Sequence, residues 1–596
     1  MVGINDATKR RFKRKLRRRR QDAIESVAQA DQQIEKLLIR RFDKLVSVRR
    51  FTLLWLSLFV VLFFCTFFQI RALSPYYQTL QPIPGGLYNE GLIGSFTNAN
   101  PMYATGAADT AVSHLVFSGL FKYDDTNQLV GDLASDYSLS ANQLHYTVNL
   151  KHNITWQDGR PFSADDVLFT YRTIQNIEAQ SPLYSSWQGI TLTKSDNYTV
   201  NFSLPNPLSS FPYSLTNGIV PAHLLSKIPA EQLRSAAFNI SPVGTGPFAW
   251  KFIEVSGTDP ENRQQRISLS PFNHYWAGRP RLDGFSIITY SDDQHVIDAF
   301  EKKQLNAVSG LETEPEELLN DKTVQVYNTP LTTAVMAFFN NSRPILADAN
   351  VRKALVGGVD RKQLVSLLGV PTRLVDGPLL KGQLGYDPSI AELPYSPDSA
   401  NQMLDQAGWV RGANGQRYKD GQLLTLGLSS QDTASYTTVA QFLQQQWAKL
   451  GVRVVPDYRP SDEVQASVIG SHSYDILLYG INIGVDPDVF AYWDSSQASL
   501  TSQGHLNLSE YKSSAADQAI EAGRTRSDPA IRAVKYKAFS TTWVHDAPAL
   551  ALYQPNYLYI TRGPVFNYER TADNSSIDRF YNVDNWEIRQ QRQTLK

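Results

Sequence analysis

The sequence predicts an α/β protein of more than one domain behind a single transmembrane helix. Strand-like runs such as residues 198–204 and 285–290 alternate with runs of helical period such as residues 351–368, and this mixture is typical of α/β folds. The chain has 596 residues, whereas single hydrophobic cores stop growing at about 250–300 residues. Near the N-terminus, residues 51–70 carry no charged side chain.

The composition is that of a globular protein. Hydrophobic residues make up 42%, aromatic residues 11% and charged residues 19% of the chain, which argues against intrinsic disorder. Cys65 is the only cysteine, so the sequence excludes an intrachain disulfide and a disulfide-stapled scaffold. Because Cys65 lies within the apolar segment, a cysteine nucleophile and a thiolate metal site are excluded as well.

Residues 51–70, FTLLWLSLFVVLFFCTFFQI, form the predicted transmembrane helix. About 20 apolar residues cross a hydrocarbon core of about 30 Å as a helix, whereas the apolar core of a secretory signal spans about 7–15 residues. The flanks of the Ala-Leu-Ser triplet at 72–74 do not suit a cleavage site, and Cys65 follows Leu-Phe-Phe where a lipoprotein signal has small residues. We therefore expect an uncleaved, single-pass anchor in the cell membrane.

The N-terminal segment, residues 1–50, is strongly basic. It holds 16 Lys and Arg against 6 Asp and Glu, a net charge of +10 that the remainder of the neutral chain balances. By the positive-inside rule, this segment is expected in the cytoplasm and everything after residue 71 outside the membrane. The run KRRFKRKLRRRR at residues 9–20 suits anionic lipid or nucleic acid, but no aromatic RNA platform or DNA-reading helix accompanies it. We expect lipid contact and no nucleic acid.

Two further N-terminal features concern the approach to the membrane and the exit from it. Six apolar residues recur at helical spacing before the membrane, interrupted by Asp31 and Arg41, which leaves a simple juxtamembrane helix and a short cytoplasmic coiled coil open. They are Ile24, Val27, Ile34, Leu38, Leu45 and Val48.

After the membrane, residues 71–86 end in PIPGG, and because Pro and Gly disfavour regular structure, we expect an irregular linker there.

Residues 116–172 carry the most informative pattern of the chain. Apolar and polar residues alternate from 144 to 150, which predicts a half-buried strand. A helix is expected next, because Ser163 can cap its N-terminus and Asp165 and Asp166 place negative charge in its first turn.

This block resembles a signature of the extracellular solute-binding proteins of peptide-type ABC transporters, the dipeptide- and oligopeptide-binding family 5 group. Tyr123, Trp156 and Asp166 are among the residues that match. Further matches follow in family order, so that the resemblance covers roughly residues 85–560. They are SPVGTGPF (241–248), NHYWAGRPRLDGF (273–285), FNNSRPILADANVRKALVGGVDRKQLV (339–365), YSPDSANQMLDQAGW (395–409) and LQQQWAKLGVRV (443–454).

The resemblance implies a two-lobed periplasmic-binding-protein-like fold of type II, with an extra subdomain in lobe I and hinges that let the lobes close on a solute. The expected organisation is a basic cytoplasmic segment (1–50), a transmembrane helix (51–70), a linker (71–86), lobe I (87–323) with its subdomain at about 112–235, lobe II (324–541) and a C-terminal return to lobe I (542–596).

The resemblance also places a ligand cleft near residues 474–493. Peptide-binding members of the family carry an aspartate three residues before an Asp-Pro in this stretch, where it pairs with the free α-amino group of the peptide. Ile483 stands at that place here. Asp486 and Asp488 are candidates to replace it, although a turn with local backbone bonds explains the Asp-Pro equally well.

The other candidate ligand-binding residues are aromatic or carry amide groups, as solute clefts do. For Trp493, core packing is slightly favoured over ligand contact, and a lone histidine such as His114 is more often structural. The candidates are Tyr479, Asn482 and Trp493 near the Asp-Pro, Asn98 and His114 on the facing lobe, and Asn340 and Asn341 at a strand end.

An enzyme is not expected. The chain has no HExxH, GxSxG or Walker glycine loop, and its nine histidines are scattered. We expect no catalytic residue, no metal and no cofactor. The resemblance implies a membrane-anchored extracellular receptor that captures an oligopeptide-like solute by lobe closure and delivers it to the permease subunits of an ABC importer. The alternative is an anchored sensor or surface binding protein for peptide, oligosaccharide or cell-wall fragment, without transport.

Overall fold

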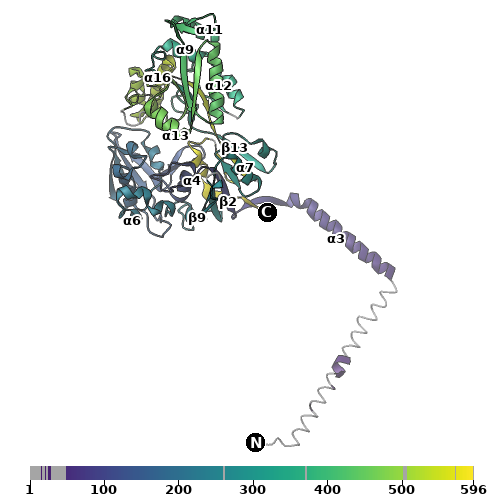
Figure 1. Ribbon diagram of the computed structural model, residues 1–596. Coiled ribbons are helices and arrows are strands. Elements are labelled where there is room, and N and C mark those ends of the chain that lie inside the picture. Colours follow the sequence, from purple (N-terminus) through teal and green to yellow (C-terminus); the bar gives the residue numbers. More distant parts are fainter. Residues whose placement is uncertain are drawn as a thin grey trace. The chain divides into compact units, whose positions relative to one another are not determined.

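The computed structural model describes residues 15, 21, 24–28, 49–259, 262–369, 372–500, 506–570 and 572–594 (Figure 1). The chain divides into two units, one of residues 1–81 and 590–596 and the other of residues 82–589. The basic run at 9–20, apart from Lys15, lies outside the described residues, and so do Ile34, Leu38, Leu45 and Val48 of the apolar stripe. The juxtamembrane helix and the coiled coil therefore stay predictions.

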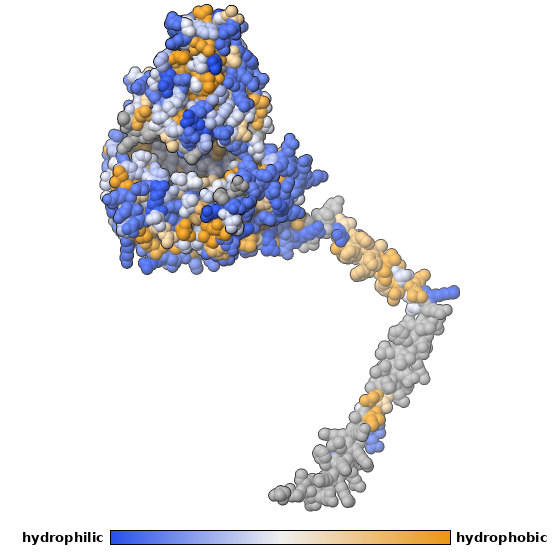
Figure 2. Space-filling model, in the orientation of Figure 1, coloured by the Kyte–Doolittle hydropathy of each residue, from blue (hydrophilic) through white to orange (hydrophobic). Residues whose placement is uncertain are grey.

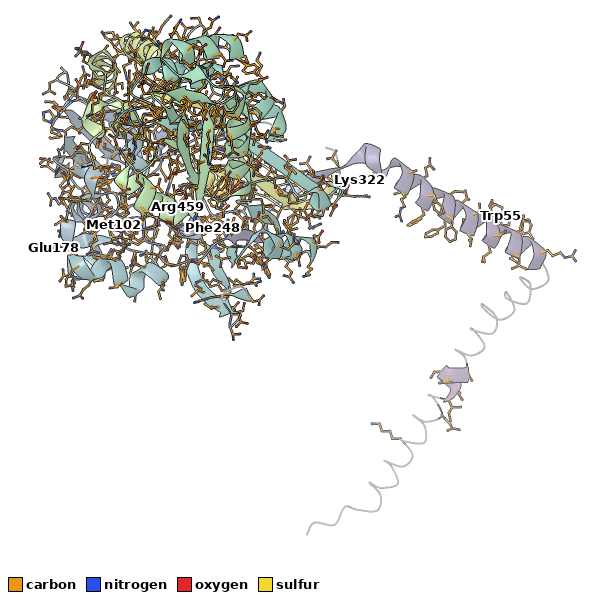
Figure 3. All side chains as sticks on the ribbon, turned by 45° about the horizontal axis from the view of Figure 1, so that its top comes forward. Trp55, Met102, Glu178, Phe248, Lys322 and Arg459 are labelled. Carbon is orange, nitrogen blue, oxygen red and sulfur yellow. The ribbon has the colours of Figure 1, made fainter. Side chains whose placement is uncertain are left out.

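The first unit contains helix α3 (Arg49–Tyr77). Residues Arg50–Ala72 are long and apolar enough to cross a membrane, with a mean hydropathy of 2.4. A helix satisfies its own backbone hydrogen bonds, which is what a hydrocarbon environment requires. The side chains of residues 50–72, Trp55 among them, project outward around the axis of this helix (Figure 3). The segment is a candidate membrane span and includes the predicted residues 51–70.

The expected irregular linker is largely regular, which corrects the prediction for residues 71–86. Helix α3 runs on to Tyr77, and strand β1 (Gln78–Ile83) follows directly. Strand β1 pairs with β24 (Arg589–Thr594) in a two-stranded sheet. Pro82 sits near the end of β1, where a strand without a second neighbour tolerates proline. The partner strand β24 lies far away in the sequence, near the C-terminal end of the described residues, so no local pattern could predict that β1 forms a strand there.

Lobe I, residues 82–330 and 556–589, is built on a seven-stranded sheet in the order β13-β23-β12-β2-β11-β10-β9. Strand β2 is parallel to both β11 and β12, and the other pairings are antiparallel. The strands are β2 (Leu87–Ile93), β9 (Phe248–Ser256), β10 (Gln264–Pro271), β11 (Gly284–Tyr290), β12 (Ala307–Ser309), β13 (Val324–Pro330) and β23 (Asn556–Arg562). Helices α4 (Ala107–Val116), α7 (Asp293–Glu301) and α8 (Glu316–Leu319) accompany it.

A second, four-stranded antiparallel sheet lies in lobe I, in the order β5-β6-β8-β7, within the stretch expected for the extra subdomain. Its strands are β5 (Ala134–Leu139), β6 (His145–Leu150), β7 (Thr191–Asp196) and β8 (Thr199–Ser203). Alternate residues of β6 are buried, which confirms the predicted half-buried strand. Helix α5 (Ala164–Ile174) is capped by Ser163 and has Asp165 and Asp166 in its first turn, as predicted, and Ser163 and Asp166 also form a capping box. The shorter β3 (Phe121–Tyr123), β4 (Leu129–Gly131) and α6 (Ala222–Leu225) complete this part.

Lobe II, residues 331–555, is built on a six-stranded sheet in the order β15-β22-β14-β21-β19-β20. The strands are β14 (Thr333–Phe339), β15 (Arg373–Leu374), β19 (Thr425–Gln431), β20 (Arg453–Arg459), β21 (Ile476–Asn482) and β22 (Ala549–Gln554). Strands β16 (Val410–Arg411), β17 (Arg417–Lys419) and β18 (Gln422–Leu423) form a small sheet of their own. The helices are α9 (Ala349–Gly357), α10 (Arg361–Leu367), α11 (Pro397–Gln406), α12 (Ala434–Lys449), α13 (Ser461–Glu463), α14 (Phe490–Trp493), α15 (Ser514–Arg524) and α16 (Pro529–Asp546).

The two sheets place the lobe boundaries later than the sequence predicted. Strand β13 still pairs in the sheet of lobe I, and α16 and β22 belong to lobe II. The chain therefore crosses between lobes near residues 331 and 555, not at 323 and 541. In Figure 1 the green part with α9, α11 and α12 is lobe II, and the part with α4, β2 and β9 is lobe I.

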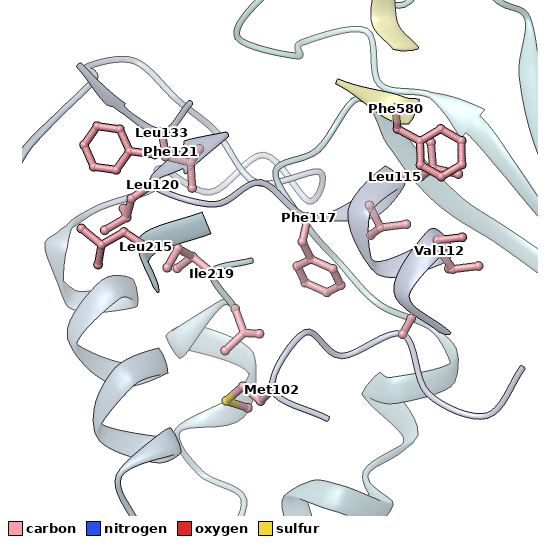
Figure 4. Packing of buried hydrophobic residues seen from close by; sticks show 14 of the residues in the cluster. Met102, Val112, Leu115, Phe117, Leu120, Phe121, Leu133, Leu215, Ile219 and Phe580 are labelled. Atoms are coloured by element: carbon pink, nitrogen blue, oxygen red, sulfur yellow. The ribbon is translucent and has the colours of Figure 1, made fainter. Parts of the chain in front are cut away.

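Each lobe has its own hydrophobic cores. Two clusters of buried residues lie in lobe I, on its sheet and subdomain, and two others lie in lobe II. Figure 4 shows part of the larger lobe I cluster, in which Val112 and Leu115 of α4, Phe117 and Phe580 pack together. This packing holds helix α4 in place, and the polar residues of α4 face the junction of the lobes.

Candidate functional site

A cavity of about 420 Å³ lies at the junction of the two lobes, and the surface is hollowed between them (Figure 2). Its size falls in the usual range of about 300–1,000 Å³ for small-molecule sites. Lobe I supplies most of the wall, from α4, β3 and two 3₁₀ turns, η4 (Phe211–Thr216) and η10 (Ser576–Phe580). Lobe II contributes Asn482 at the end of β21.

Helix α4 presents Thr110, Ser113 and His114 to the cavity. The His114 ring stacks on Phe580, with ring centroids 6.2 Å apart and planes 25° from parallel. Burial lowers the pKa of His114 to about 4, and the nearby positive charge of Lys122 acts in the same direction. The imidazole is therefore neutral at pH 7 and can offer one hydrogen-bond donor and one acceptor.

The charged side chains in the wall are held by bonds within the protein. Asp132 accepts a hydrogen bond from the indole Nε1 of Trp276 at 3.1 Å. Asp578 accepts from the backbone N–H groups of Asn574 and Ser575, at 2.7 and 3.1 Å. Burial raises the pKa of both carboxyls. The Nζ of Lys122 donates to a backbone carbonyl in lobe I at 3.1 Å.

Aromatic rings form the rest of the lobe I wall. Phe117 and Phe121 belong to the core cluster shown in Figure 4 and also line the cavity. Tyr123 lines it too and stacks on Tyr213, with centroids 6.3 Å apart. A wall of rings beside hydroxyl and amide groups can hold a solute that is both apolar and rich in hydrogen-bonding groups.

Asn482 connects the cavity wall to the segment near residue 331, where the chain crosses from lobe I to lobe II. Its Oδ1 accepts from the Thr332 hydroxyl at 3.2 Å, and its Nδ2 donates to the carbonyl of Asn574 in lobe I at 3.1 Å. Thr332 lies one residue after the chain first enters lobe II. Asn482 is the one of the seven ligand-binding residues predicted in lobes I and II that lines this cavity, and the weaker candidate His114 lines it as well.

Asp486 and Asp488, the candidate replacements for the missing counter-charge, are each paired with an arginine. The Oδ1 of Asp486 lies 2.6 Å from Nη2 of Arg532, and the Oδ2 of Asp488 lies 3.3 Å from Nη2 of Arg524. Neither aspartate lines the cavity described above. Ile483, at the place of the family aspartate, is buried.

Trp493 and Asn340 lie within lobe II. Trp493 is fully buried and stacks on Phe338, with its edge against Trp543, so it packs in the core. Asn340 is buried as well, and its Nδ2 donates to the carbonyl of His472 at 3.2 Å.

Three further candidates also lie away from this wall. The Tyr479 hydroxyl accepts from Gln465 at 3.4 Å. Asn98 bonds through its Oδ1 to the backbone N–H of Asn100 at 2.9 Å, a local turn. The backbone N–H of Asn341 donates to the carbonyl of Ser509 at 2.8 Å. For these residues ligand contact stays a prediction.

Sequence reasoning missed most of the lobe I wall. Ser214 and Thr216 of η4 and the stretch 574–584 line the cavity, yet none was a candidate. One local signal was present, because Ser575 and Asp578 have the spacing of a capping box and form one. Among the residues that the structure describes, no group of three or more His, Cys, Asp or Glu side chains could hold a metal ion.

Comparison with known proteins agrees with this architecture. Residues 128–501 match the family model of bacterial extracellular solute-binding proteins, family 5 Middle. The chain is 25% identical over 522 residues to the oligopeptide-binding protein AppA of Bacillus subtilis, covering 82% of this chain and 92% of that protein.

Two solved structures share the fold. The structure of AppA of Bacillus subtilis with a nonapeptide has a TM-score of 0.71 at 23% identity, covering 85% of this chain and 100% of the other. The structure of NikZ of Campylobacter jejuni with Ni(L-His) has a TM-score of 0.72 at 23% identity, covering 84% and 99%. With its two lobes and the match to more than half of its length, the chain belongs to family 5 of the bacterial extracellular solute-binding proteins.

Proposed function

We propose that this chain is a membrane-anchored extracellular receptor that captures a peptide-like solute between its lobes and delivers it to the permease subunits of an ABC importer. The cavity at the lobe junction carries the proposal, because its wall combines aromatic rings with hydroxyl, amide and imidazole groups. Solute contacts to both lobes exist only when the lobes are together. Binding therefore shifts the population toward closure by the difference in affinity between the two states.

Family membership supports the transport role, and the AppA structure with a nonapeptide supports a peptide as the solute. The polar groups of the wall include both donors and acceptors, and a peptide backbone can bond to both kinds. Asn482 and the neutral His114 can each donate and accept. With Ile483 buried and both nearby aspartates paired, recognition here depends on amide and aromatic contacts, not on a salt bridge to a free α-amino group.

Helix α3 supports the anchoring part of the proposal, since residues Arg50–Ala72 have the length and hydropathy of a membrane span. The basic charge of residues 1–50 favours a cytoplasmic N-terminus and an extracellular position for both lobes. A receptor held in this way stays near a membrane-embedded permease.

The test is to identify what copurifies with the full-length protein in detergent. Mass spectrometry of material released by denaturation should find short peptides, and calorimetry should then measure their rebinding to the emptied protein. Asn482→Ala, with its place in the cavity wall, should release less material. Recovery of saccharides in place of peptides would overturn the peptide assignment and leave the receptor assignment standing.

A further inference from the structure

The two lobes touch directly beside the cavity, through hydrogen bonds between side chains and backbone groups of both lobes. On the lobe I side are Ser209 and Ser210, just before η4, and on the lobe II side are Asp488 and Arg524. The Ser210 hydroxyl donates to Oδ2 of Asp488 at 2.8 Å. The backbone N–H and the hydroxyl of Ser209 both donate to the carbonyl of Arg524, each at 2.9 Å.

The lobe II half of this contact is held in place by lobe II itself. Arg524 pairs with Asp488 through its guanidinium, which also lies 4.0 Å from the centre of the Phe490 ring. Arg532 bonds to Asp486 and donates through Nε to the carbonyl of Gly523 at 2.9 Å. The loop after β21 and the end of α15 are therefore fixed to each other by contacts within lobe II, independently of lobe I.

The backbone carbonyl of Arg524 is a favourable acceptor for the two donors of Ser209. Arg524 is the last residue of α15, and carbonyl groups in the last turn of a helix lack a helical N–H partner. The helix dipole adds partial negative charge there. The carboxylate offered to Ser210 is charged, and hydrogen bonds to charged acceptors are stronger than neutral ones.

The lobe I half moves with the cavity wall. Phe211 follows the two serines, is buried, and packs its ring against Tyr146 and Phe202. The same turn, η4, carries Ser214 and Thr216 into the cavity. Any motion that separates the serines from lobe II therefore also moves this part of the cavity wall away from Asn482 of lobe II.

We propose that these four residues, Ser209, Ser210, Asp488 and Arg524, form a latch that holds the two lobes together in the absence of solute. The inference rests on the proposed function, since it concerns the closure by which the solute is captured. The latch raises the fraction of protein that is closed before solute binds. The apparent affinity for solute rises with this fraction, because the closed state is the one that contacts solute through both lobes. Asp488 thus acts on affinity through lobe closure and not as a counter-charge for the solute.

The test measures closure in the full-length protein without solute. Cys65→Ser removes the only cysteine, and Ile177→Cys in lobe I and Leu367→Cys in lobe II provide exposed positions for a pair of fluorophores. Single-molecule energy transfer then gives the ratio of closed to open protein. We expect Ser210→Ala to lower this ratio about three- to tenfold, equivalent to about 0.7–1.4 kcal/mol. Ser241→Ala, an exposed serine of lobe I, is the matched control and should leave the ratio unchanged.

Asp488→Asn provides a second variant, because it keeps an acceptor for Ser210 but weakens the pair with Arg524. Its effect should lie between those of Ser241→Ala and Ser210→Ala. Equal ratios in all three proteins would overturn the latch. If the ratio falls in Ser210→Ala while no peptide binds, the latch stands and the proposed solute is wrong. If peptides bind and the ratio is unchanged, the latch is wrong and the proposed function stands.

Discussion

Glu90 and Arg579 are 489 residues apart in the sequence and form a fully buried ion pair, with Nη2 of Arg579 2.6 Å from Oε1 of Glu90. Glu90 lies in β2 and Arg579 in η10, so the pair joins the first strand of the lobe I sheet to the turn that lines the cavity. The hydroxyl of Tyr559 donates to the second oxygen of Glu90 at 2.9 Å. The carboxylate thereby holds three elements of lobe I together.

Loss of this pair should destabilise the protein strongly. Arg579→Met leaves Glu90 buried without its partner, which typically costs about 3–5 kcal/mol of unfolding free energy. Urea unfolding followed by circular dichroism measures the change. Lys194→Ala removes an exposed ion pair with Asp165 and serves as the control, with an expected loss below about 1 kcal/mol. Equal losses in the two variants would contradict the role of the buried pair.

His114 should make stability depend on pH in the acidic range. Its pKa falls to about 4 in the folded protein from an ordinary value of 6.5, so the unfolded chain takes up its proton first. The contribution is fully present above pH 6.5 and is lost as the pH falls toward 4, by at most about 3 kcal/mol. His114→Gln should flatten the profile between these values. A profile that keeps its slope in the variant would assign the effect to other groups.

Trp493 should behave as a core residue. Trp493→Ala opens a large cavity between Phe338 and Trp543 and should cost about 3–5 kcal/mol of unfolding free energy. Trp493→Phe keeps a ring in the same place and should cost less. The affinity of the Trp493→Phe variant for solute, measured by calorimetry, should stay within about twofold of that of the unmodified protein. A large loss of affinity with little loss of stability would mean that Trp493 contacts the solute.

Asn482 should matter for affinity more than for stability. Asn482→Ala removes a cavity-lining amide together with its bonds to Thr332 and Asn574, and about tenfold weaker solute binding is expected, equivalent to about 1.4 kcal/mol. Asn414→Ala, at an exposed asparagine of lobe II outside the cavity wall, is the control and should bind normally. The prediction fails if both variants bind alike in calorimetry.

Deletion of residues 1–48, with a replacement signal for membrane insertion, separates transport from signalling. Solute uptake by cells should survive, because the lobes and helix α3 are retained. A response that disappears while solute binding persists would favour the alternative of an anchored sensor. Uptake of a radiolabelled peptide by cells carrying either form is the measurement.

Local patterns predicted much of the fold. The alternation around Tyr146 and the cap at Ser163 each depend on a few neighbouring residues, and both appear as expected. The run of helical period at 351–368 is helical, and it is divided into α9 and α10 with a break after Gly357. The lobe boundaries were missed because they depend on which sheet a strand joins, a choice made by distant partners.

The site was harder to predict than the fold. Asn482 could be found because it ends a strand that the family resemblance placed at the cleft. Asp486 could not be assigned, because its partner Arg532 lies 46 residues away on another helix. A carboxylate looks the same in the sequence whether it awaits a ligand or is neutralised by an arginine. Only the folded chain distinguishes the two.

The pairing of β1 with β24 fixes an order of events during biosynthesis. Strand β1 ends at Ile83 and β24 begins at Arg589, so the ribosome makes both lobes between these two strands. Strand β1 therefore has no β24 partner until both lobes have been synthesised. A chain that stopped before Arg589 would therefore contain almost all of both lobes and would leave β1 without its partner strand.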